Sequence, residues 1–599
     1  MLSVLLGCSP EYQPQGSPSM PASPPAECES TEEPREFVAS PASCPPQEVD
    51  LQLLWNAAEA PLLSGAYHSR AALVVAPLWD SNLDGAVTTK DDLVVLAHAF
   101  SDLSGSDTSD MLVLDGASGR LLTSWRAEGL PHPLIGTPAV GRLRPGEAPS
   151  VVYVSQEREV IALDADFRVR WTTAVQPYIN PIGHEVSLVD LDDDGVLEVV
   201  VPPYLFDATG AALGRFEVDL DPNDDDIDYL FGADFYDLDH DGRGEILFPM
   251  AWFGADFSPR WSVEPRNGTA VAAGRWEGRV EVFSHTSDTG GSETDDYSTV
   301  EMYDATGQHI WTETGSYGNY GHAALGDLDG DGLPEVVVGT YGELIAYTGG
   351  GPRLWTVDTD RTGSASMAPT LFDFTGDGLL DVAYAGELTF LLVDGATGEV
   401  LFEDSRRCST ADRGQPIIAD LDGDGSAELL VGTGPCDDDP GGVKAYTSRD
   451  RAWRTDARLW PMSGWRSGQY DDDLVSESVA EYSARDSILR GQERAEWEVI
   501  RPRLDGWCRN ADGTLEALVS VENVGGVASD GLVLRADQGG AHVDVVPLPT
   551  ALPAETGYGQ LRLQVDESAG EVTLDVFRAD GRAICPTLST QSVDLPVSG

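Results

Sequence analysis

One short acidic motif recurs along the chain, and its repetition constrains the fold more than any other feature. The clearest copy, DLDGDGLPEVVVG at residues 327–339, places aspartates on three alternate positions, then a glycine, then a glutamate that opens a run of valines. Carboxylates spaced this way on a tightly curled loop can surround a divalent cation, and the glycine permits the bend. The valine run predicts a buried strand. We therefore expect a cation-binding loop followed by a strand that fixes it.

Further copies recur at a regular spacing. Those starting at residues 327, 373 and 420 are 46 and 47 residues apart, and others start at residues 190 and 237. Two decayed copies, GRLRPGEAPSVVYV from Gly141 and GRWEGRVEVF from Gly274, carry arginines where the other copies carry acidic residues, so we expect them to bind no metal. A period of 40 to 50 residues with this content is typical of propeller blades.

A second repeated feature is a strand, a turn and a strand that ends near an aromatic residue. The turns read Asp-x-x-Thr/Ser-Gly, in which the glycine supplies the left-handed position of a hairpin. The aromatics are 44 to 51 residues apart and comprise Trp125, Trp171, Phe216, Trp261, Trp311, Trp355, Phe402 and Trp453. We interpret them as packing contacts between blades. The repeat therefore predicts an all-β fold, a seven- or eight-bladed β-propeller. The extra strand LQLLW, ending at Trp55, is expected to pair with the last blade and close the ring.

The regions outside the repeat differ in composition. Residues 1–8 resemble a lipoprotein signal, since Leu5, Leu6, Gly7 and Cys8 resemble a bacterial lipobox, although only seven residues precede Cys8 and none is basic. Either the sequence starts within a longer leader or the resemblance is accidental. Residues 9–48 are rich in proline, serine and glutamate and predict a disordered tether. Lipidation of Cys8 followed by Ser9 implies secretion across the inner membrane and an outer-membrane or cell-surface location.

The domain prediction places the propeller at residues 49–470, a connector at residues 471–500 and a β-sandwich at residues 501–599. Alternating strands in the last segment are typical of an immunoglobulin-like sandwich. The string VSVENVGGVASDGLVL resembles the CARDB adhesion-related domains of bacterial surface proteins. Outside the cytosol an even set of cysteines suggests disulfides, with the connectivity left open. The candidates are Cys28 with Cys44, Cys408 with Cys436, and Cys508 with Cys585.

The recurring DxDxDGxx(D/E) pattern resembles the FG-GAP, or VCBS, repeats of integrin alpha-chain propellers and bacterial surface proteins. The resemblance covers about 420 residues and implies that each loop holds Ca²⁺ through its first, third, fifth and ninth side chains. The implied ligands are Asp190, Asp192, Asp194 and Glu198; Asp237, Asp239, Asp241 and Glu245; Asp327, Asp329, Asp331 and Glu335; Asp373, Thr375, Asp377 and Asp381; and Asp420, Asp422, Asp424 and Glu428. Thr375 departs from the pattern and is expected to weaken its site.

A sixth candidate loop follows the spacing of an EF-hand, with Asp80, Asn82, Asp84 and Asp91 as ligands, but strands rather than helices are expected to flank it. The sequence thus predicts about five or six Ca²⁺ ions. Oxygen ligands without histidine or cysteine favour calcium over transition metals. The alternative is that these loops are Asx-type turns without metal.

The charge and the motif content narrow the function. With 37 Lys and Arg against 101 Asp and Glu, the formal charge is -64, which disfavours nucleic acid and anionic lipid as partners. The sequence contains no HExxH, GxSxG or CxxC motif, so no catalytic residue is predicted and the protein is not expected to be an enzyme. We expect a calcium-binding surface propeller with a binding, adhesion or scaffold role, an extracellular protein or glycan ligand, and membrane contact only through a lipid anchor. The alternative is a secreted propeller enzyme, either a polysaccharide lyase or hydrolase or a quinoprotein-like dehydrogenase.

Overall fold

The computed structural model divides the chain into two compact units, Pro45–Ala495 and the combination of Met1–Cys44 with Glu496–Gly599. The structure describes residues 49, 51–57, 68–69, 73–100, 109–133, 136–175, 185–216, 233–249, 251–262, 267–276, 279–288, 297–316, 322–340, 342–349, 351–359, 367–386, 388–404, 415–434, 441–448, 453, 455, 457–464, 466, 469–470, 474–483 and 489–490, and the backbone of seven strands between residues 500 and 594.

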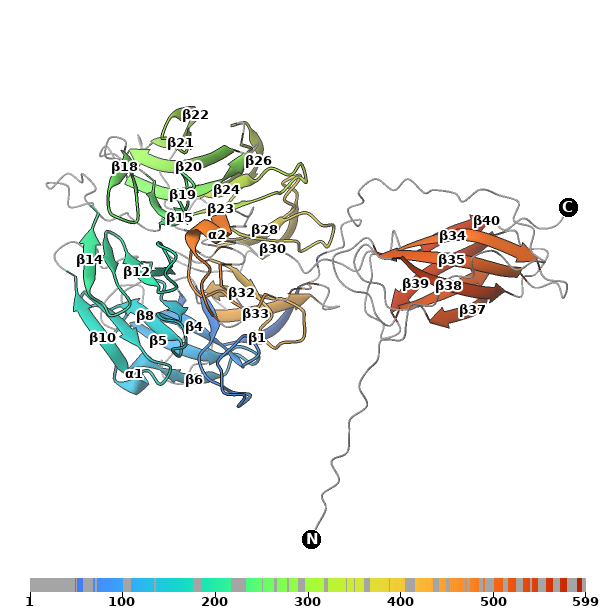
Figure 1. The fold of residues 1–599 in the computed structure, drawn as a ribbon, viewed down its shortest axis with the longest axis horizontal. Coiled ribbons are helices and arrows are strands. Elements are labelled where there is room, and N and C mark those ends of the chain that lie inside the picture. The colour runs from blue at the N-terminus through green and yellow to red at the C-terminus, as the bar shows by residue number, and fades with distance from the viewer. Residues whose placement is uncertain are drawn as a thin grey trace, which may run out of the picture. The chain divides into compact units, whose positions relative to one another are not determined.

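The described strands of Pro45–Ala495 form eight antiparallel sheets in a ring, so the predicted propeller is confirmed with eight blades rather than seven (Figure 1). Blade 1 contains β2 (His68–Ser69), β3 (Val74–Pro77), β4 (Leu93–Phe100), β5 (Ser109–Asp115) and β6 (Leu121–Ser124), followed by α1 (Trp125–Glu128). Blade 2 contains β7 (Ala139–Gly141), β8 (Ser150–Val154), β9 (Glu159–Leu163) and β10 (Val169–Ala174). Blade 3 contains β11 (Ser187–Val189), β12 (Glu198–Val201), β13 (Tyr204–Phe206) and β14 (Ala212–Arg215). Blade 4 contains β15 (Asp234–Tyr236), β16 (Glu245–Phe248), β17 (Ala251–Phe253) and β18 (Pro259–Ser262).

The remaining blades continue in chain order. Blade 5 contains β19 (Asn267–Trp276), β20 (Arg279–Asp288), β21 (Tyr297–Asp304) and β22 (His309–Ser316). Blade 6 contains β23 (Ala323–Gly326), β24 (Glu335–Thr340), β25 (Glu343–Tyr347) and β26 (Arg353–Asp358). Blade 7 contains β27 (Thr370–Phe372), β28 (Asp381–Ala385), β29 (Phe390–Val393) and β30 (Val400–Asp404). Blade 8 contains β31 (Ile417–Ala419), β32 (Glu428–Thr433), β33 (Gly442–Ser448) and β1 (Leu51–Asn56).

The ring closes through β1, which pairs antiparallel with β33 as the outermost strand of blade 8. The register runs from Leu51 opposite Ser448 to Asn56 opposite Lys444. Trp55 in this strand is 9% exposed, and its indole Nε1 donates to the Gly116 carbonyl of blade 1 at 3.0 Å. The predicted closure by the LQLLW segment is therefore confirmed.

Aromatic residues join neighbouring blades in the same way around much of the ring. The Nε1 of Trp171 in blade 2 donates to the Ala208 carbonyl of blade 3 at 3.1 Å, and that of Trp355 in blade 6 donates to the Gly395 carbonyl of blade 7 at 2.6 Å. The ring of each tryptophan covers the turn of the next blade. Trp125 differs, because it lies in α1 and stacks on Tyr153 with ring centroids 4.7 Å apart.

The centre of the ring is filled by the described part of residues 457–490, which we call the central plug. It includes α2 (Val479–Ser483), which lies near the middle of the ring in Figure 1. The plug bonds to the innermost strand of blades 1 to 7, which is β3 in blade 1, and to a residue beside the innermost strand of blade 8; in blade 4 it also bonds to Asp237 beside that strand. These contacts are Trp460 with Val75, Pro461 with Val140, Tyr470 with Leu188, Ser483 with Asp237, Arg466 with Ala273, Leu489 with Leu325, Arg490 with Leu371, and Ala457 with Asp420. The plug therefore touches all eight blades.

The second unit contains β34 (Ile500–Arg509), β35 (Leu515–Asn523), β36 (Leu532–Gln538), β37 (Ala541–Pro547), β38 (Thr556–Leu563), β39 (Glu571–Arg578) and β40 (Thr590–Asp594). They pair as one sheet in the order β34-β35-β38 and another in the order β37-β36-β39-β40. An immunoglobulin-like sandwich remains a prediction.

Several predictions fall outside the described residues: the lipobox with Cys8, the tether, and the cysteines Cys28, Cys44, Cys408, Cys436 and Cys585. The backbone of Cys508 lies in β34, but its side chain is not described. Among the described helices, none is long enough to cross a membrane.

Candidate metal centres

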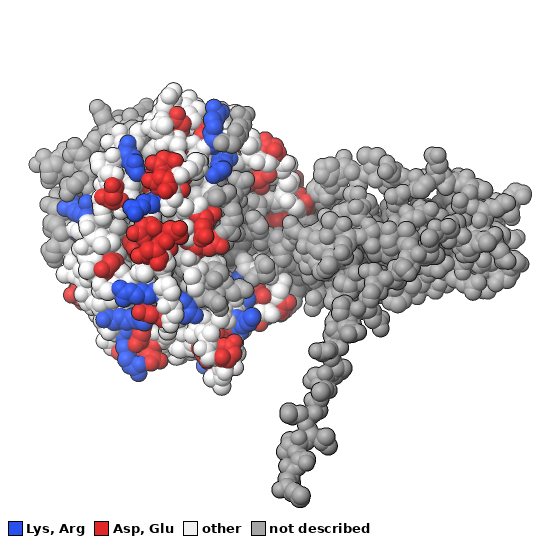
Figure 2. All heavy atoms as spheres, viewed as in Figure 1, with Lys and Arg blue, Asp and Glu red and all other residues white. Residues whose placement is uncertain are grey.

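The six acidic loops each connect the innermost strand of a blade to the next strand, which in blade 1 means β3 to β4. They span residues 80–91 in blade 1, 190–197 in blade 3, 237–244 in blade 4, 327–334 in blade 6, 373–380 in blade 7 and 420–427 in blade 8. Because the blades are antiparallel meanders that start at the central plug, these turns lie on one face of the ring. Figure 2 shows acidic side chains gathered in separate patches on the face that it presents, with basic side chains between them.

Four loops bring three carboxylate oxygens within 4.8 Å of one another. The converging residues are Asp190, Asp192 and Asp194 in blade 3; Asp237, Asp239 and Glu245 in blade 4; Asp327, Asp329 and Glu335 in blade 6; and Asp420, Asp422 and Glu428 in blade 8. Unneutralised carboxylates at this separation repel one another, and a divalent cation would remove that repulsion.

The backbone of each loop holds its first aspartate in a fixed orientation. In blade 3, Asp190 accepts hydrogen bonds from the amides of Asp194 at 3.2 Å and Gly195 at 2.9 Å. Gly195 has a φ of 76°, a left-handed conformation that glycine adopts without strain. In the other five loops the backbone N–H of the glycine at position 6 donates the corresponding hydrogen bond to the first aspartate. The acceptors are Asp80, Asp237, Asp327, Asp373 and Asp420. The loops are thus built alike, whether or not their carboxylates converge.

The ninth-position glutamate supplies the buried side of the clusters in blades 4, 6 and 8, whereas the blade 3 cluster consists of aspartates alone. In blade 6, Glu335 is 1% exposed and its Oε2 accepts from the Leu328 amide at 2.8 Å. The same bond joins Glu198 to Leu191, Glu245 to Leu238 and Glu428 to Leu421. One oxygen of each glutamate is therefore held by the backbone, and in blades 4, 6 and 8 the same carboxylate also belongs to the three-acid cluster.

Burial, reinforced by the neighbouring aspartates, raises the pKa of these glutamates in the absence of a cation. Burial raises the pKa of Glu335 to about 8, and it has the same effect on Glu198 and Glu428. The pKa of Glu245 rises to about 7, again chiefly through burial. These carboxyls would carry protons near neutral pH unless a cation replaced those protons.

The donor set fits a calcium ion. Ca²⁺ prefers several oxygen donors on a flexible loop, and each converging loop offers carboxylate oxygens from several acidic side chains. No histidine or cysteine stands at a ligand position. In blade 8, Glu428 is fully buried and its Oε1 receives no hydrogen bond from the described residues. A buried charged oxygen without a donor is costly, so a bound cation would supply the missing partner.

The loop of blade 7 differs in its buried acid. Asp381 is 1% exposed, and its carboxylate accepts the amides of Phe374 at 2.8 Å and Thr375 at 2.9 Å, and that of Gly395 at 3.3 Å. Both of its oxygens are engaged by the backbone. Among the described residues, this loop forms no three-acid group of the kind seen in the four converging loops.

In the EF-hand-like loop of blade 1, the buried acid is also hydrogen-bonded by backbone amides of its own loop. Asp91 accepts the amides of Ser81 at 2.8 Å, Asn82 at 3.1 Å and Thr88 at 2.8 Å. Burial alone would raise the pKa of Asp91, but these amides lower it below its usual range. Asp80, Asp84 and Asp91 are likewise absent from the three-acid groups of the described residues.

Two arginines beside the loops were not predicted from the sequence. In blade 4, the Arg260 guanidinium lies 3.6 Å from the Asp239 and Glu245 carboxylates. In the central plug, Arg458 donates through Nε to the Asp420 carbonyl of blade 8 at 3.1 Å. No motif signals either residue, because each reaches its loop from a distant part of the chain.

Comparison with known proteins supports an FG-GAP-type propeller. A family model described as an FG-GAP-like repeat matches residues 327–384, which contain the acidic loops of blades 6 and 7. No curated protein matches the sequence. The crystal structure of the V. cholerae biofilm matrix protein Bap1 is similar in fold, with a TM-score of 0.61 at 14% identity over 74% of this chain and 99% of that chain.

Other solved structures are less similar. The europium-containing methanol dehydrogenase has a TM-score of 0.38 at 13% identity, over 67% of this chain and 94% of that chain. BBS1N in complex with ARL6DN has a TM-score of 0.34 at 11% identity, over 66% of this chain and 99% of that chain.

Proposed function

We propose that this protein is a calcium-stabilised extracellular propeller that acts as a rigid binding or adhesion module at the cell surface. The observation that carries the calcium assignment is the buried ninth-position glutamate of blades 4, 6 and 8, which the backbone holds through one oxygen and which lies in a cluster with two aspartates. In blade 6 these ligands are Asp327, Asp329 and Glu335. The bound ion would neutralise the carboxylates and join the start of β24 to the end of β23.

The proposed location rests on the same sites. Modules of this kind bind calcium at roughly 0.1 to 1 mM, so they fill outside cells and not in a cytosol. A surface role agrees with the similarity in fold to a protein described as a biofilm matrix protein. The proposal includes attachment through lipidated Cys8, disulfides among the other cysteines, and a CARDB-like β-sandwich formed by the strands β34 to β40.

The proposed role is binding without catalysis. Six loops on one face of a plugged ring form a stiff surface on which a protein or glycan could dock. The central plug fills the position in which many propellers hold a ligand, so we place the binding surface on the loops and the rim. The sequence contains none of the catalytic motifs HExxH, GxSxG and CxxC, so nothing in it points to an enzyme.

The experiment that tests the calcium assignment is a pair of melting curves for Asp329→Ala. We expect the variant to melt below the wild type in millimolar calcium and to match it in EDTA, because the side chain acts through the ion. The control is Asp166→Ala, which removes an exposed acid from a blade 2 turn outside the loops. Equal losses for Asp329→Ala in both conditions would refute metal ligation. Attachment of the full chain to glycan-coated surfaces, with and without EDTA, tests the adhesive role.

A further inference from the structure

Arg260 in β18 reaches the acidic loop of its own blade. Its guanidinium lies 3.6 Å from Asp239 Oδ2, 3.6 Å from Glu245 Oε1 and 3.9 Å from Asp241 Oδ2. These three residues belong to the four-acid set of blade 4. A positive charge of the chain itself therefore lies against three of the four carboxylates that would hold a cation.

The other converging loops have no arginine at the equivalent position, and Arg458 beside the blade 8 loop differs from Arg260 in donating to the backbone carbonyl of Asp420. Arg260 immediately precedes Trp261, which stands opposite Trp252 in the register of the outer strand pair. The position of Arg260 can be found in the other blades from the same register of the outer strand pair. In blades 3, 6, 7 and 8 it is occupied by leucine, namely Leu213, Leu354, Leu401 and Leu54. A leucine side chain carries no charge, so it cannot neutralise a carboxylate.

Blade 2 shows what an arginine at this position does. Arg170 precedes Trp171, which stands opposite Ala162, so it occupies the place of Arg260. Its Nη1 lies 2.8 Å from Glu147 Oε2, in the loop between the first two strands of blade 2. That loop has lost the four-acid pattern, and the arginine pairs with its remaining glutamate. In both blades, an arginine at this position thus pairs with a carboxylate in the loop between the first two strands of its own blade.

We propose that Arg260 is an internal counter-cation that competes with calcium for the blade 4 loop and makes this the weakest of the four converging sites. The inference rests on the calcium binding proposed above. A guanidinium remains charged at any physiological pH, so it cannot leave the carboxylates by losing a proton. Calcium must therefore displace the side chain. Arg260 is 41% exposed, which gives it a path to solvent when the ion enters.

The consequence is a graded response within one ring. The loops of blades 3, 6 and 8 would fill first as calcium rises, and blade 4 would fill last. Its filling would transfer the Arg260 charge from the loop to solvent on the face that carries the sites. The blade 4 loop would then respond to calcium over a higher concentration range than its neighbours do.

The test is a calcium titration of the full chain by calorimetry and equilibrium dialysis, comparing wild type with Arg260→Leu, which installs the residue found in the other blades. We expect the weakest of the wild-type sites to tighten by about tenfold, within the usual range of coupling between two binding events. A second variant, Arg260→Gln, should show the same gain if charge and not shape is responsible. The matched control is Arg353→Leu in β26, since Arg353 pairs with Glu313 and lies outside any acidic loop. Its isotherm should match that of the wild type.

A further variant assigns the site. Arg260→Leu combined with Glu245→Gln should abolish the gain, because the tightened site uses Glu245. Calcium binding by the wild type with no change in Arg260→Leu would overturn the counter-cation role and leave the proposed function intact. An absence of calcium binding in every variant would overturn both. Melting curves in EDTA verify that each variant is folded.

Discussion

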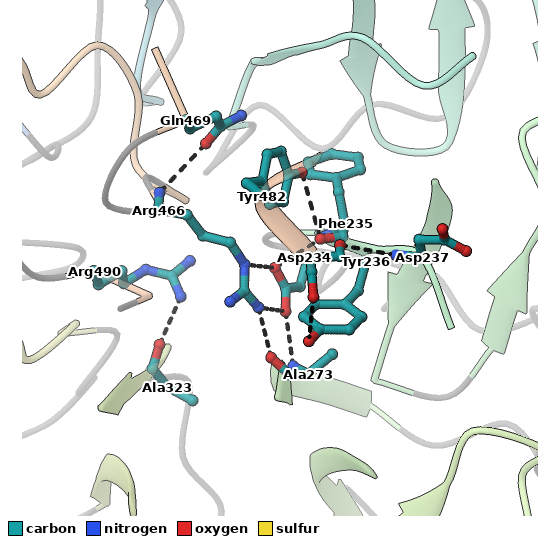
Figure 3. A network of polar contacts seen from close by, with 11 residues as sticks. Asp234, Phe235, Tyr236, Asp237, Ala273, Ala323, Arg466, Gln469, Tyr482 and Arg490 are labelled. Atoms are coloured by element: carbon teal, nitrogen blue, oxygen red, sulfur yellow. Dashed lines mark hydrogen bonds and ion pairs between the residues drawn. The ribbon is translucent and has the colours of Figure 1, made fainter. Parts of the chain in front are cut away.

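Arg466 and Asp234 form a buried two-pronged ion pair in the centre of the ring, although 232 residues separate them. The guanidinium donates through Nε to Oδ1 at 3.1 Å and through Nη2 to Oδ2 at 2.5 Å (Figure 3). The same Nη2 donates to the Ala273 carbonyl of blade 5 at 2.8 Å. Asp234 also accepts the Ala273 amide at 2.8 Å. One arginine of the central plug therefore joins the innermost strands of blades 4 and 5.

Removing this pair should destabilise the propeller far more than removing a surface pair. Arg466→Met leaves Asp234 charged and buried, and breaking a buried pair costs about 3 to 5 kcal/mol. The comparison is Arg353→Met, whose partner Glu313 is 30% exposed, for which a loss of about 1 kcal/mol or less is expected. Urea unfolding followed by tryptophan fluorescence measures both. Similar small losses for the two variants would show that the plug contributes little to stability.

Closure of the ring depends on Trp55. Trp55→Ala should cost about 3 to 5 kcal/mol, because a large buried side chain is removed from the junction of blades 8 and 1. Trp55→Phe keeps most of the packing and loses the bond to Gly116, so it should cost about 1 kcal/mol. Thermal melting and protease sensitivity of β1 distinguish the two. A Trp55→Ala variant as stable as the wild type would mean that the ring does not rely on this contact.

The turn glycines beneath the aromatics should tolerate no side chain. Gly307 has a φ of 83°, and a Cβ built on it would lie 1.9 Å from Trp261 Cδ1. Gly146 has a φ of 77° with no atom within 4 Å of such a Cβ. Gly146→Ala should therefore cost about 1 to 2 kcal/mol for the left-handed backbone alone. Gly307→Ala should cost more, because the blade interface must also shift. Equal losses in melting temperature for the two variants would contradict this.

The sequence predicts what is local or periodic in this fold. The spacing from Asp327 to Glu335 lies within one loop, so the order of side chains is enough to recognise it. Trp55 could be paired with the last blade because the repeat count left one strand over. These features repeat with the blades, and the repetition distinguishes them from chance.

The central plug escaped prediction because its contacts are not periodic. Leu489 pairs with Leu325 and Arg466 with Asp234 across long separations, and no pattern in residues 457–490 indicates which blade each residue meets. Arg260 escaped for a similar reason. It is an ordinary exposed strand residue in sequence, and only the folded blade places it beside Asp239. Contacts between residues that are far apart in the sequence can be recognised only in the folded structure.

Without calcium, the stability of the propeller should fall as pH rises. The pKa of Glu198, Glu335 and Glu428 is raised to about 8 by burial, against 4.5 for an exposed glutamate. The folded state then binds more protons than the unfolded chain between these values. Its stability is full below the unfolded pKa and is lost as pH rises through the folded pKa. Melting temperatures in EDTA should fall between about pH 5 and about pH 9, more steeply than in calcium. A flat EDTA profile would contradict the burial of these glutamates.

The same glutamates should release protons when calcium binds near neutral pH, because the ion requires the carboxylates ionised. Calorimetric titrations in buffers of different ionisation enthalpy measure the number of protons released per protein. More than one proton per protein is expected at pH 7. Glu335→Gln should lower the number released. No dependence on the buffer would contradict the raised pKa values.

The most direct test of the account is metal analysis of the purified full chain, combined with melting curves in calcium and in EDTA. The account predicts bound calcium at a stoichiometry of at least four ions, one for each converging cluster, and a clear fall in melting temperature on chelation. A protein that contains no alkaline-earth ion and melts at the same temperature with and without EDTA would contradict it.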